Sequence, residues 1–368
     1  MKVLITGYDG FIGKNLCAKL KEKNIQFIEF GKKDNFSKIE KKIGEISFIF
    51  HLAGSNRPKK EKEFTETNYK LTKKIINLLR KKQLKIPILF TSSIQAKLKN
   101  PYGISKKLAE QELIKYSKEL ETPLFIYRLP NIFGKWGKPY SNSVIATFCY
   151  QISREEKIKI NNPVAKLFLS YIDDIVEEFF QKIGKKSEDK FYSPKKIYKI
   201  SLNLIVKKII EFEKSRKNFQ IPKLNDEFTK KLYSTYLSYL DPKKLSSPLN
   251  EKKDKRGRFM EILKSKKFGQ FSISYSKQKI RRGEHYHHTK VEKFIVIKGK
   301  AKIRFRDIFG KNIIEYEVSD KNLEIIDIPP GYIHSIENIG KSEMILLIWA
   351  NEIFNPNKPD TYFMEVEK

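Results

Sequence analysis

Hydrophobic positions follow different patterns in the two halves of the chain. In the first half, short β-branched and aromatic runs alternate with amphipathic stretches of helical period, and the runs lie at 2–5, 25–30, 48–52 and 88–91. This alternation predicts an α/β fold whose parallel strands are joined by helices, one of them at about 65–82. After residue 258 the apolar runs are short and regularly spaced, at 269–275, 294–297, 301–305, 313–318 and 344–349. These runs predict an all-β barrel.

The stretch between the two patterns has the composition of a linker. Residues 241–258 read DPKKLSSPLNEKKDKRGR and are rich in proline, serine and charge. We therefore predict a first domain at 1–243, a linker at 244–258 and a second domain at 259–368. A chain of 368 residues, 40% of them hydrophobic, is long enough for two cores of this size.

The composition is strongly basic, with 75 Lys and Arg against 43 Asp and Glu and a formal net charge of +32. The cations are scattered along every segment and mixed with glutamate, without the basic stripe or recognition helix of a nucleic-acid binder. We therefore predict no nucleic-acid partner. A positive field of this kind favours small polyanions such as a dinucleotide phosphate or a nucleotide sugar.

Cysteine usage and the N-terminus indicate the compartment. Cys17 and Cys149 lie in apolar surroundings, which is typical of reduced cytoplasmic proteins rather than of disulfide scaffolds. The N-terminus enters a strand at once, and no apolar run approaches the ~18 residues of a membrane span. We expect a cytoplasmic protein that neither is secreted nor crosses a membrane.

A glycine-rich turn follows the first strand. Gly7, Gly10 and Gly13 are spaced as G-x-x-G-x-x-G, with Phe11 and Ile12 between the last two. Glycines here permit a tight turn and let backbone N–H groups approach a pyrophosphate at the positive end of a helix. The motif alone is a weak signal, and its position directly after a strand strengthens it.

The end of the second strand bears on which dinucleotide binds. NAD enzymes commonly place an acidic residue there for the ribose 2′-hydroxyl, whereas this strand ends in Phe30-Gly31-Lys32-Lys33. Because Lys32 and Lys33 suit a 2′-phosphate, we predict NADPH. Glu29 lies one position before the usual place of that acidic residue, so NAD remains the alternative cofactor.

Tyr102 and Lys106 are four residues apart and therefore share one face of a predicted helix. A lysine ammonium beside a phenol lowers the pKa of that phenol. The tyrosine can then exchange a proton near neutral pH while a serine holds the reacting carbonyl.

Together these residues resemble the extended short-chain dehydrogenase/reductase family, over about residues 1–241. The resemblance implies a Rossmann-type sheet and catalysis by Tyr102, Lys106 and Ser93, with Ser92 as the alternative serine. It implies that the nicotinamide cofactor is bound by Gly7, Gly10, Phe11, Ile12, Gly13, Lys32, Lys33, Leu52, Ala53, Gly54, Tyr102 and Lys106. Further marks of the family are Asn68 and the runs Arg128–Gly134 and Tyr171–Val176.

Four of the five histidines fall in two short stretches of the second domain. His285 and His287 are two residues apart, so on a strand they point to the same face, and Glu292 can return on the next strand. His334 lies in the second stretch. Three imidazoles and a carboxylate suit Zn²⁺, Fe²⁺, Mn²⁺ or Ni²⁺ and leave positions open for a substrate oxygen.

The two stretches resemble the paired motifs of the cupin superfamily, a small antiparallel β-barrel. The first motif matches His285, His287, Glu292 and Gly299, and the second, P-x-G-x-x-H-x-x-x-N, matches Pro329, Gly331, His334 and Asn338. The resemblance implies that the ligands of a divalent metal, for which we predict zinc, are His285, His287, Glu292 and His334.

The first stretch also resembles the metal-free nucleotide-sugar 3,5-epimerases. Arg282–Tyr286 matches their R-G-x-H-[FY] motif, and Asp254–Glu261 matches D-x-R-G-x-F-x-E. In that family the histidine at the position of His285 removes a proton beside a sugar ketone, so His285 has two possible roles. His287 replaces a glutamine of those epimerases, which favours the metal. The base stays open between His285, Lys290, Lys293 and Tyr286.

A sugar-ketone reductase followed by a cupin is similar to the bifunctional capsular polysaccharide synthesis enzymes of the CapF type. The resemblance covers nearly the whole chain. It implies that a UDP-2-acetamido-2,6-dideoxy-4-hexulose is epimerised at C3 in the cupin and then reduced at C4 by NADPH in the first domain. The product implied is a UDP-6-deoxy-N-acetylhexosamine of talose type, in the UDP-N-acetyl-L-fucosamine pathway.

We also expect a homodimer. Two alternatives stay open. One is a reductase whose cupin only binds sugar or holds a dimer together. The other is a non-enzymatic NADP sensor, which would normally lack the tyrosine and lysine present here.

Overall fold

The computed structural model describes residues 1–55, 62–141, 143–160, 162–249, 251–254, 257–260, 269–352 and 355–368. Their contacts separate two compact units, Met1–Ser143 with Lys166–Ile200, and Val144–Ala165 with Ser201–Lys368. None of the helices in the described residues is both long enough and apolar enough to span a bilayer.

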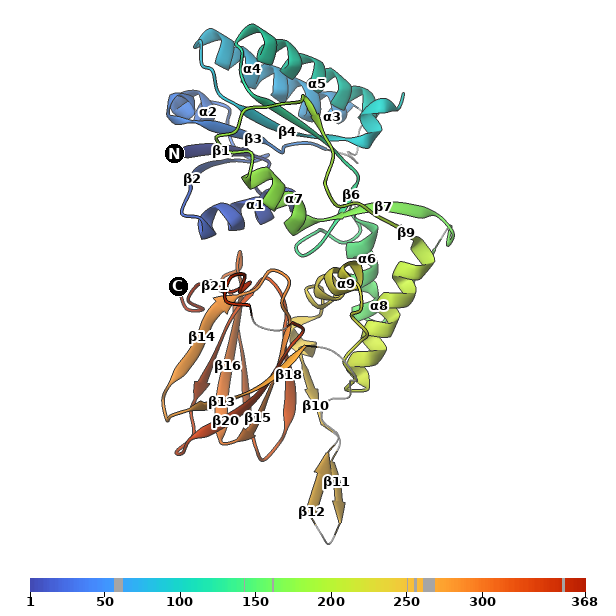
Figure 1. The fold of residues 1–368 in the computed structure, drawn as a ribbon, viewed down its shortest axis with the longest axis vertical. Helices are drawn as coiled ribbons and strands as arrows, with labels where there is room; N and C mark the ends of the chain where they lie inside the picture. The colour runs from blue at the N-terminus through green and yellow to red at the C-terminus, as the bar shows by residue number, and fades with distance from the viewer. Residues whose placement is uncertain are drawn as a thin grey trace. The chain divides into compact units, whose positions relative to one another are not determined.

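The first unit is built on a six-stranded sheet (Figure 1). Its strands are, in spatial order, β2 (Gln26–Phe30), β1 (Lys2–Thr6), β3 (Phe48–His51), β4 (Ile88–Ser93), β5 (Leu124–Leu129) and β8 (Phe191–Tyr192). All of these pairings are parallel. The strand order reverses between β1 and β3, and open α/β sheets bind ligands at the carboxyl ends of strands at such a reversal. The predicted Rossmann-type fold is confirmed.

Helices cover both faces of this sheet, which explains why β3 and β4 are buried along their whole length. In Figure 1, α4 and α5 lie together over one face, and α1 and α7 over the other. The helices of this unit are α1 (Phe11–Glu22), α2 (Ser37–Lys42), α3 (Lys62–Phe64), α4 (Leu71–Lys81), α5 (Pro101–Glu119) and α7 (Ile172–Phe180). The shorter turns are η1 (Ile43–Glu45), the π-helical η2 (Thr65–Lys70) and η3 (Ile94–Lys97). A second sheet joins β6 (Asn131–Phe133), β7 (Lys166–Tyr171) and β9 (Tyr198–Ser201).

The second unit contains a barrel made of two five-stranded sheets. One sheet has the order β10 (Ser246–Pro248), β18 (Glu324–Ile328), β15 (Glu292–Lys298), β20 (Met344–Ala350) and β13 (Gln270–Ser276). The other has the order β17 (Ile313–Ser319), β16 (Lys300–Asp307), β19 (Tyr332–Asn338), β14 (Arg281–Tyr286) and β21 (Tyr362–Phe363). A separate hairpin joins β11 (Glu251–Asp254) to β12 (Gly257–Met260). The barrel pairings are antiparallel, so the predicted all-β fold is confirmed.

Both barrel sheets contribute to one apolar core. Phe294 and Leu346 come from the first sheet, and Ile303, Phe305 and Ile336 come from the second. In β16 the buried Ile303 and Phe305 alternate with half-buried residues, whereas β15 and β19 are buried on both faces next to Phe294 and Ile336. One member of this core, Phe294, lies with its ring 5.9 Å from that of the predicted metal ligand His334.

Helices also belong to the second unit, a feature that the chain's hydrophobic pattern does not reveal. They are α6 (Val144–Ser153), α8 (Leu202–Lys217), α9 (Glu227–Leu237) and the 3₁₀ turn η4 (Pro242–Lys244). Arg216 of α8 pairs with Asp327 of β18 (2.5 Å), which also pairs with Lys293 of β15, and Asp327 is only 1% exposed. Such a buried cluster fixes its partners in place, because removing one member leaves another charge unpaired.

This grouping differs from the predicted domain plan in two places. Residues 144–165 and 201–243, expected in the first domain, pack with the barrel. Residues 246–248, expected in the linker 244–258, are strand β10, paired with β18. Composition alone misses both features because the stabilising partners are distant in sequence. The functional boundaries at 243 and 258 stay a prediction.

Candidate active sites

The glycine turn connects β1 to α1 at the reversal point of the parallel sheet. The N–H of Gly7 donates to the carbonyl of Phe30 on the neighbouring strand (2.7 Å), and Gly10 caps α1. A Cβ on Gly13 would lie 2.2 Å from the carbonyl oxygen of Gly7, so only glycine lets the helix close on the turn. Phe11 and Ile12 form the start of a first helical turn without acidic residues, whose N–H groups can donate to a phosphate.

A second predicted cofactor-binding loop lies at the same end of the sheet. Leu52, Ala53 and Gly54 follow β3, and the N–H of Ala53 donates to the hydroxyl of Thr6 (3.2 Å). A Cβ on Gly54 would lie 2.9 Å from Nζ of Lys106, so the structure brings this loop against the predicted catalytic lysine.

Lys32 and Lys33 follow β2 and are exposed. Beside them lies Asp34, a carboxylate that the sequence interpretation overlooked. Asp34 accepts a hydrogen bond from the N–H of Gly31 (2.8 Å) and pairs with Lys38 (3.0 Å). These contacts, the first of them largest, lower the pKa of Asp34. The loop therefore has two exposed cations next to a carboxylate that is already paired with Lys38. The choice of NADPH over NADH stays a prediction.

The predicted catalytic residues of the first unit lie together at the carboxyl end of β4. Asn100 caps α5 by accepting the N–H of Gly103 (2.7 Å), and this start places Tyr102 and Lys106 one turn apart. The phenol of Tyr102 is hydrogen-bonded to the hydroxyl of Ser93, the last residue of β4. Lys106 is buried and donates to the carbonyl of Thr91 (2.9 Å).

The sequence predicts that Lys106 lowers the pKa of Tyr102, and this prediction is wrong for the chain without a cofactor. Burial raises the pKa of Tyr102, and the hydrogen bond with Ser93 opposes this only in part. Lys106 is not among the causes of this shift, and its ammonium donates to the carbonyl of Thr91. Burial lowers the pKa of Lys106 to about 8, against the opposite influence of Glu110. A phenol that stays protonated at neutral pH is a proton donor, which suits reduction of a ketone.

The two candidate serines differ in their partners. Ser92 donates to Glu110 (2.5 Å), and the same carboxylate pairs with Arg128 (2.7 Å). Ser92 is therefore held on the side of β5, whereas Ser93 is held on the side of Tyr102. This arrangement favours Ser93. Glu110 was missed in the sequence, although it lies four residues after Lys106 on the same helix.

Asn68, a mark of the resemblance, joins the loop after β3 to α5. Its side chain exchanges hydrogen bonds with the backbone of Ser55 (2.8 and 2.9 Å) and donates to the hydroxyl of Ser105 (2.9 Å). Asn68 lies in the π-helical turn η2, and such turns often place a side chain at a functional site.

The four predicted metal ligands of the barrel are brought together. One ligand atom from each of the four lies within 4.8 Å of the others, the residues being His285, His287, Glu292 and His334. His285 on β14 faces His334 on β19, with ring centroids 4.6 Å apart. His287 directly follows β14, and Glu292 begins β15.

A bulge in β14 sets this arrangement. The pairing with β19 shifts between Gly283 and His285, and Gly283 has a φ of +98°. A Cβ at Gly283 would lie 2.8 Å from the carbonyl oxygen of His334. Glycine is therefore required for β14 to approach β19 where the two histidines meet.

The distances inside the cluster fit a divalent cation. Nε2 of His287 and Nε2 of His334 lie 3.5 and 3.7 Å from Oε2 of Glu292. Neither nitrogen has a hydrogen-bond partner in the part of the chain that the structure describes. Two ligand atoms each ~2.1 Å from a tetrahedral ion are about 3.4 Å apart, close to both separations.

The pKa values of the cluster also suit the binding of a divalent cation. Burial, followed by the neighbouring His287, lowers the pKa of His285 to about 4, and burial also lowers the pKa of His334 well below its usual range. Burial alone would raise the pKa of Glu292, but the contacts with His287 outweigh it and the net direction is downward. Neutral imidazoles and an ionised carboxylate are the states in which these groups bind metals.

The structure separates the candidates for the base. Lys293 pairs with the buried Asp327, and Tyr286 packs on the rings of Tyr362 and His288. Each is adjacent in a strand to a cluster residue and so faces the opposite way. The ammonium of Lys290 donates to the carbonyl of Pro359 and the hydroxyl of Thr361 (both 2.9 Å). Its charge also contributes to the lowered pKa of Glu292, after the effects of burial and His287. Of the Asp254–Glu261 motif, residues 255, 256 and 261 lie outside the described residues.

The C-terminal segment lies beside the cluster. The ring of Phe363 is 6.2 Å from that of His285 and the side chain is 84% exposed. A cavity of about 590 Å³ is lined there by Glu284, Phe363, Met364, Glu365 and Lys368. Another cavity, of about 850 Å³, includes Met1 and Ile25 before β1 and β2. It lies at the end of the sheet opposite to the glycine turn and includes none of the predicted cofactor-binding residues.

Two family models match the chain. The NAD dependent epimerase/dehydratase family matches residues 3–192, and the Polysaccharide biosynthesis C-terminal domain matches residues 252–362. The first match covers the glycine turn and Tyr102. The second covers the histidine cluster.

Among curated proteins, the chain is 42% identical to the UDP-2-acetamido-2,6-beta-L-arabino-hexul-4-ose reductase of Pseudomonas aeruginosa, over 100% of this chain and 99% of that protein. It is 27% identical to the dTDP-D-glucose 4,6-dehydratase of Dictyostelium discoideum, over 57% of this chain and 61% of that protein.

Among solved structures, the capsular polysaccharide assembling protein CapF from Staphylococcus aureus is 45% identical, with 100% of both chains covered and a TM-score of 0.68. The UDP-glucose 4-epimerase of Thermus thermophilus is 16% identical, covers 58% of this chain and 84% of its own, and has a TM-score of 0.52. The second likeness concerns the fold alone.

Proposed function

We propose, since this chain belongs to the CapF-type family of capsular polysaccharide enzymes, that it acts on a UDP-2-acetamido-2,6-dideoxy-4-hexulose. The barrel inverts C3 of this sugar, and the first unit then reduces the C4 ketone. The reductase named among its relatives supports the second step. The histidine cluster, with ring nitrogens that lack hydrogen-bond partners among the described residues, is the observation that supports the first.

Reduction is assigned to Tyr102, Ser93 and Lys106. When bound, NADPH supplies the hydride that attacks C4, and Lys32 and Lys33 are the residues proposed to favour it over NADH. The Ser93 hydroxyl holds the ketone oxygen, and the protonated phenol of Tyr102 delivers a proton to that oxygen as charge develops. The ammonium of Lys106 adds a positive charge at the carboxyl end of β4.

Epimerisation is assigned to the barrel because the C4 ketone makes the C3 proton acidic. A divalent cation held by the four-residue cluster, for which zinc is our proposal, supplies electrostatic stabilisation of the negative charge formed beside the ketone. The candidates for the residue that moves the C3 proton are Lys290, whose ammonium donates to the carbonyl of Pro359 and the hydroxyl of Thr361 (both 2.9 Å), and His285 in the case that it does not hold the cation. Reprotonation from the other face inverts the centre. Reduction removes the ketone and with it the acidity, so the inverted centre is then fixed.

The inhibitor bound to a related protein supports the proposed metal site. One of the related CapF structures, 42% identical to this chain, contains the inhibitor 3-isopropenyl-tropolone. Tropolones bind cations through two adjacent oxygens, and hard or borderline divalent ions accept such ligands.

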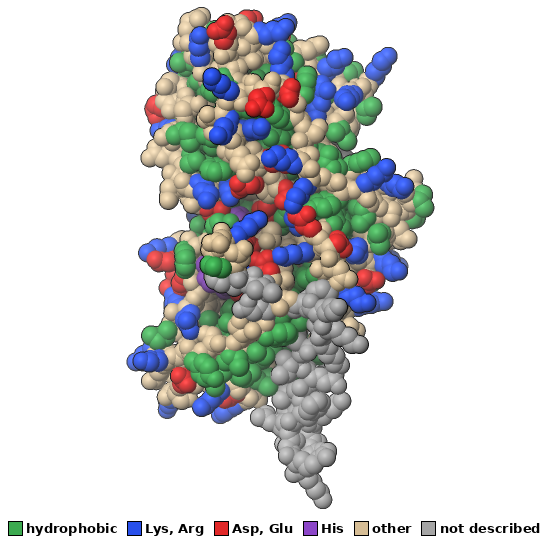
Figure 2. All heavy atoms as spheres, in the orientation of Figure 1, with side chains coloured by type: hydrophobic (Ala, Val, Ile, Leu, Met, Phe, Trp, Pro, Cys, Tyr) green, Lys and Arg blue, Asp and Glu red, His purple; other side chains and the backbone are tan. Residues whose placement is uncertain are grey.

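A second copy of the chain is proposed as the partner of β13. Phe271, Ile273 and Tyr275 alternate along this strand and are 51, 55 and 56% exposed. They face outward beside Ile345 and Leu347 of β20, where Figure 2 shows apolar side chains gathered on the barrel. Since β13 is an edge strand among the described residues, a two-fold axis can place two such faces together. Ile273→Lys should shift the molar mass measured by light scattering from dimer to monomer.

The two activities can be separated by deuterium exchange. The keto sugar in D₂O without NADPH should gain deuterium at C3, measured by NMR. Tyr102→Phe should lower NADPH oxidation by about 10³-fold and leave this exchange intact. His334→Ala should abolish the exchange while the protein still oxidises NADPH with the C3-inverted sugar. If exchange survives His334→Ala, the barrel is a sugar-binding or dimerisation module and not an epimerase.

A further inference from the structure

A short turn between β14 and β15 carries one of the proposed metal ligands. His287 directly follows β14, and residues 288–291 lead to Glu292 at the start of β15. This turn has no ladder of its own to hold it. Its two ends are held by backbone bonds, from the N–H of Gly331 to the carbonyl of His287 (2.9 Å) and from the N–H of Asn351 to the carbonyl of Val291 (3.0 Å). The residues between these ends and the ring of His287 need other partners.

Asp360, about 70 residues later, supplies most of that support. Its carboxylate accepts the backbone N–H groups of His288 (3.1 Å), Thr289 (2.8 Å) and Lys290 (2.7 Å), and also the hydroxyl of Thr289 (2.9 Å). Four donors on one carboxylate fix the path of the turn, because hydrogen bonds to an ionised acceptor are stronger than neutral ones.

The backbone of Asp360 sets the ring of the ligand itself. Its carbonyl oxygen accepts Nδ1–H of His287 (2.7 Å), which leaves Nε2 as the acceptor nitrogen, 3.5 Å from Glu292. Asp360 has a φ of +42°, a left-handed conformation that aspartate tolerates better than most residues. The same residue therefore orients the imidazole through its carbonyl and the turn through its carboxylate.

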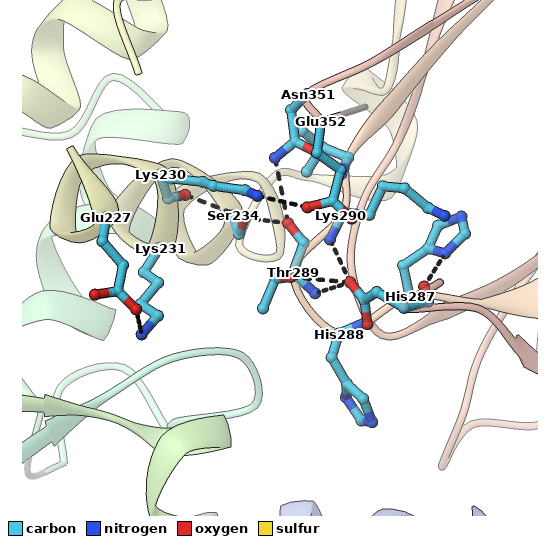
Figure 3. A network of polar contacts seen from close by, with 12 residues as sticks. Glu227, Lys230, Lys231, Ser234, His287, His288, Thr289, Lys290, Asn351 and Glu352 are labelled. Atoms are coloured by element: carbon cyan, nitrogen blue, oxygen red, sulfur yellow. Dashed lines mark hydrogen bonds and ion pairs between the residues drawn. The ribbon is translucent and has the colours of Figure 1, made fainter. Parts of the chain in front are cut away.

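Helix α9 holds the turn from the other side. Ser234 donates to the carbonyl of Thr289 (2.6 Å), and Lys230 pairs with Glu352 (2.5 Å). Figure 3 shows Ser234 and Lys230 reaching from the helix to this part of the barrel. Asn351 adds a bond to the N–H of Val291 (3.1 Å). The turn is thus clamped between α9 and the C-terminal segment.

We propose that Asp360 is the positioning residue of the metal site, holding His287 so that its Nε2 faces Glu292 and His334. The inference rests on the proposed metal site and goes beyond it, since Asp360 is not itself one of the four ligands. A residue that orients a ligand in this way typically changes metal affinity by about 10- to 100-fold when it is lost. Ser234, with a single bond to the turn, contributes less.

The test is metal affinity of the full chain, measured by competition for Zn²⁺ with a chromogenic chelator. Asp360→Ala should bind Zn²⁺ about 10- to 100-fold more weakly, Asp360→Asn should fall between it and the unchanged protein, and Ser234→Ala should lose about threefold. Asp320→Ala is the matched control, because Asp320 accepts the N–H of Gly299 (2.9 Å) in the same barrel but contacts none of the four ligands. It should leave the affinity unchanged.

A spectrum separates positioning from general stability. Co²⁺-loaded Asp360→Asn should show visible absorption bands altered from those of the unchanged protein, whereas Asp320→Ala should reproduce them. If both Asp360 variants bind Zn²⁺ like the Asp320 control and give the same Co²⁺ spectrum, the inference is overturned while the metal site stands. If the unchanged protein binds neither ion, the proposed function itself fails.

Discussion

The two sites of this molecule satisfy their polar groups in opposite ways. In the reductase site, Tyr102 is bonded to Ser93, Lys106 to the carbonyl of Thr91, and Ser92 to Glu110. In the barrel, Nε2 of His287 and Nε2 of His334 have no hydrogen-bond partner in the described part of the chain. Buried polar atoms are normally paired, so unpaired nitrogens that converge on one carboxylate indicate a site built for a cation.

The sites also differ in how they use charge. The reductase site keeps a buried cation beside a phenol whose pKa is raised by burial, which favours delivery of a proton. In the barrel, burial lowers the pKa of His285 to about 4 and the pKa of His334 well below its usual range, while the pKa of Glu292 is also lowered. These shifts favour binding of a positive ion. This difference supports the proposal of proton transfer in the first site and of a metal ion in the second.

Removing the metal should produce the largest contrast between the sites. A chelator in the buffer should lower C3 deuterium exchange on the order of 10³-fold, because the negative charge formed beside the ketone loses its stabilisation. NADPH oxidation with the C3-inverted sugar should be unchanged. Exchange is measured by NMR, with metal content by atomic emission, and Zn²⁺ should restore it. Full exchange by metal-free protein would show that the cluster is not a metal site.

The two neighbouring serines test the reductase site. Ser93→Ala should lower kcat for NADPH oxidation by about 10²- to 10³-fold, because the ketone oxygen loses a positioned donor. Ser92→Ala should cost less than about tenfold, since its hydroxyl is occupied by Glu110. Neither variant should alter exchange at C3. A larger loss for Ser92→Ala would transfer the role to that serine.

The ionisation of Lys106 should limit the reductase at alkaline pH. Its pKa is lowered to about 8, so the ammonium is present below that pH and lost above it. If the charge is needed, kcat/KM for reduction falls about tenfold for each pH unit above the inflection. Lys106→Arg, which retains its charge, should keep some activity and move the inflection upward.

The matched control is Lys107→Arg at the exposed neighbouring position, which should leave the profile as it is. An inflection that stays in place in Lys106→Arg would belong to another group.

The residues that carry the chemistry of both sites could be predicted from the sequence, but for different reasons. Gly7, Gly13, Tyr102 and Lys106 lie in motifs whose spacing reflects a turn or a helix, so their geometry is local and readable. The four cluster residues were also found by spacing, although they meet only through pairing of β14, β15 and β19. Chemistry-bearing residues of both sites were thus predictable.

The sequence did not reveal the residues that hold the sites in place, because these residues belong to no motif. Asp360 is separated from His287 by most of the barrel, and its five acceptor contacts, four at the carboxylate and one at the carbonyl, follow from the path of the C-terminal segment. The packing of α9 with the barrel depends on Ser234 and Lys230, which read as ordinary helix-surface residues. The raised pKa of Tyr102 depends on burial, which spacing does not measure.

The smallest effect expected concerns how the barrel holds its sugar nucleotide. Phe363 is 84% exposed and 6.2 Å from His285, a position from which its ring can stack on a base or a sugar. Phe363→Ala should raise KM for C3 exchange by about tenfold with little change in kcat, since stacking binds substrate and transition state alike. Phe363→Tyr should restore KM because the stacking face is kept. KM for NADPH should not change in either variant, and a fall in kcat without a change in KM would instead place Phe363 in support of His285.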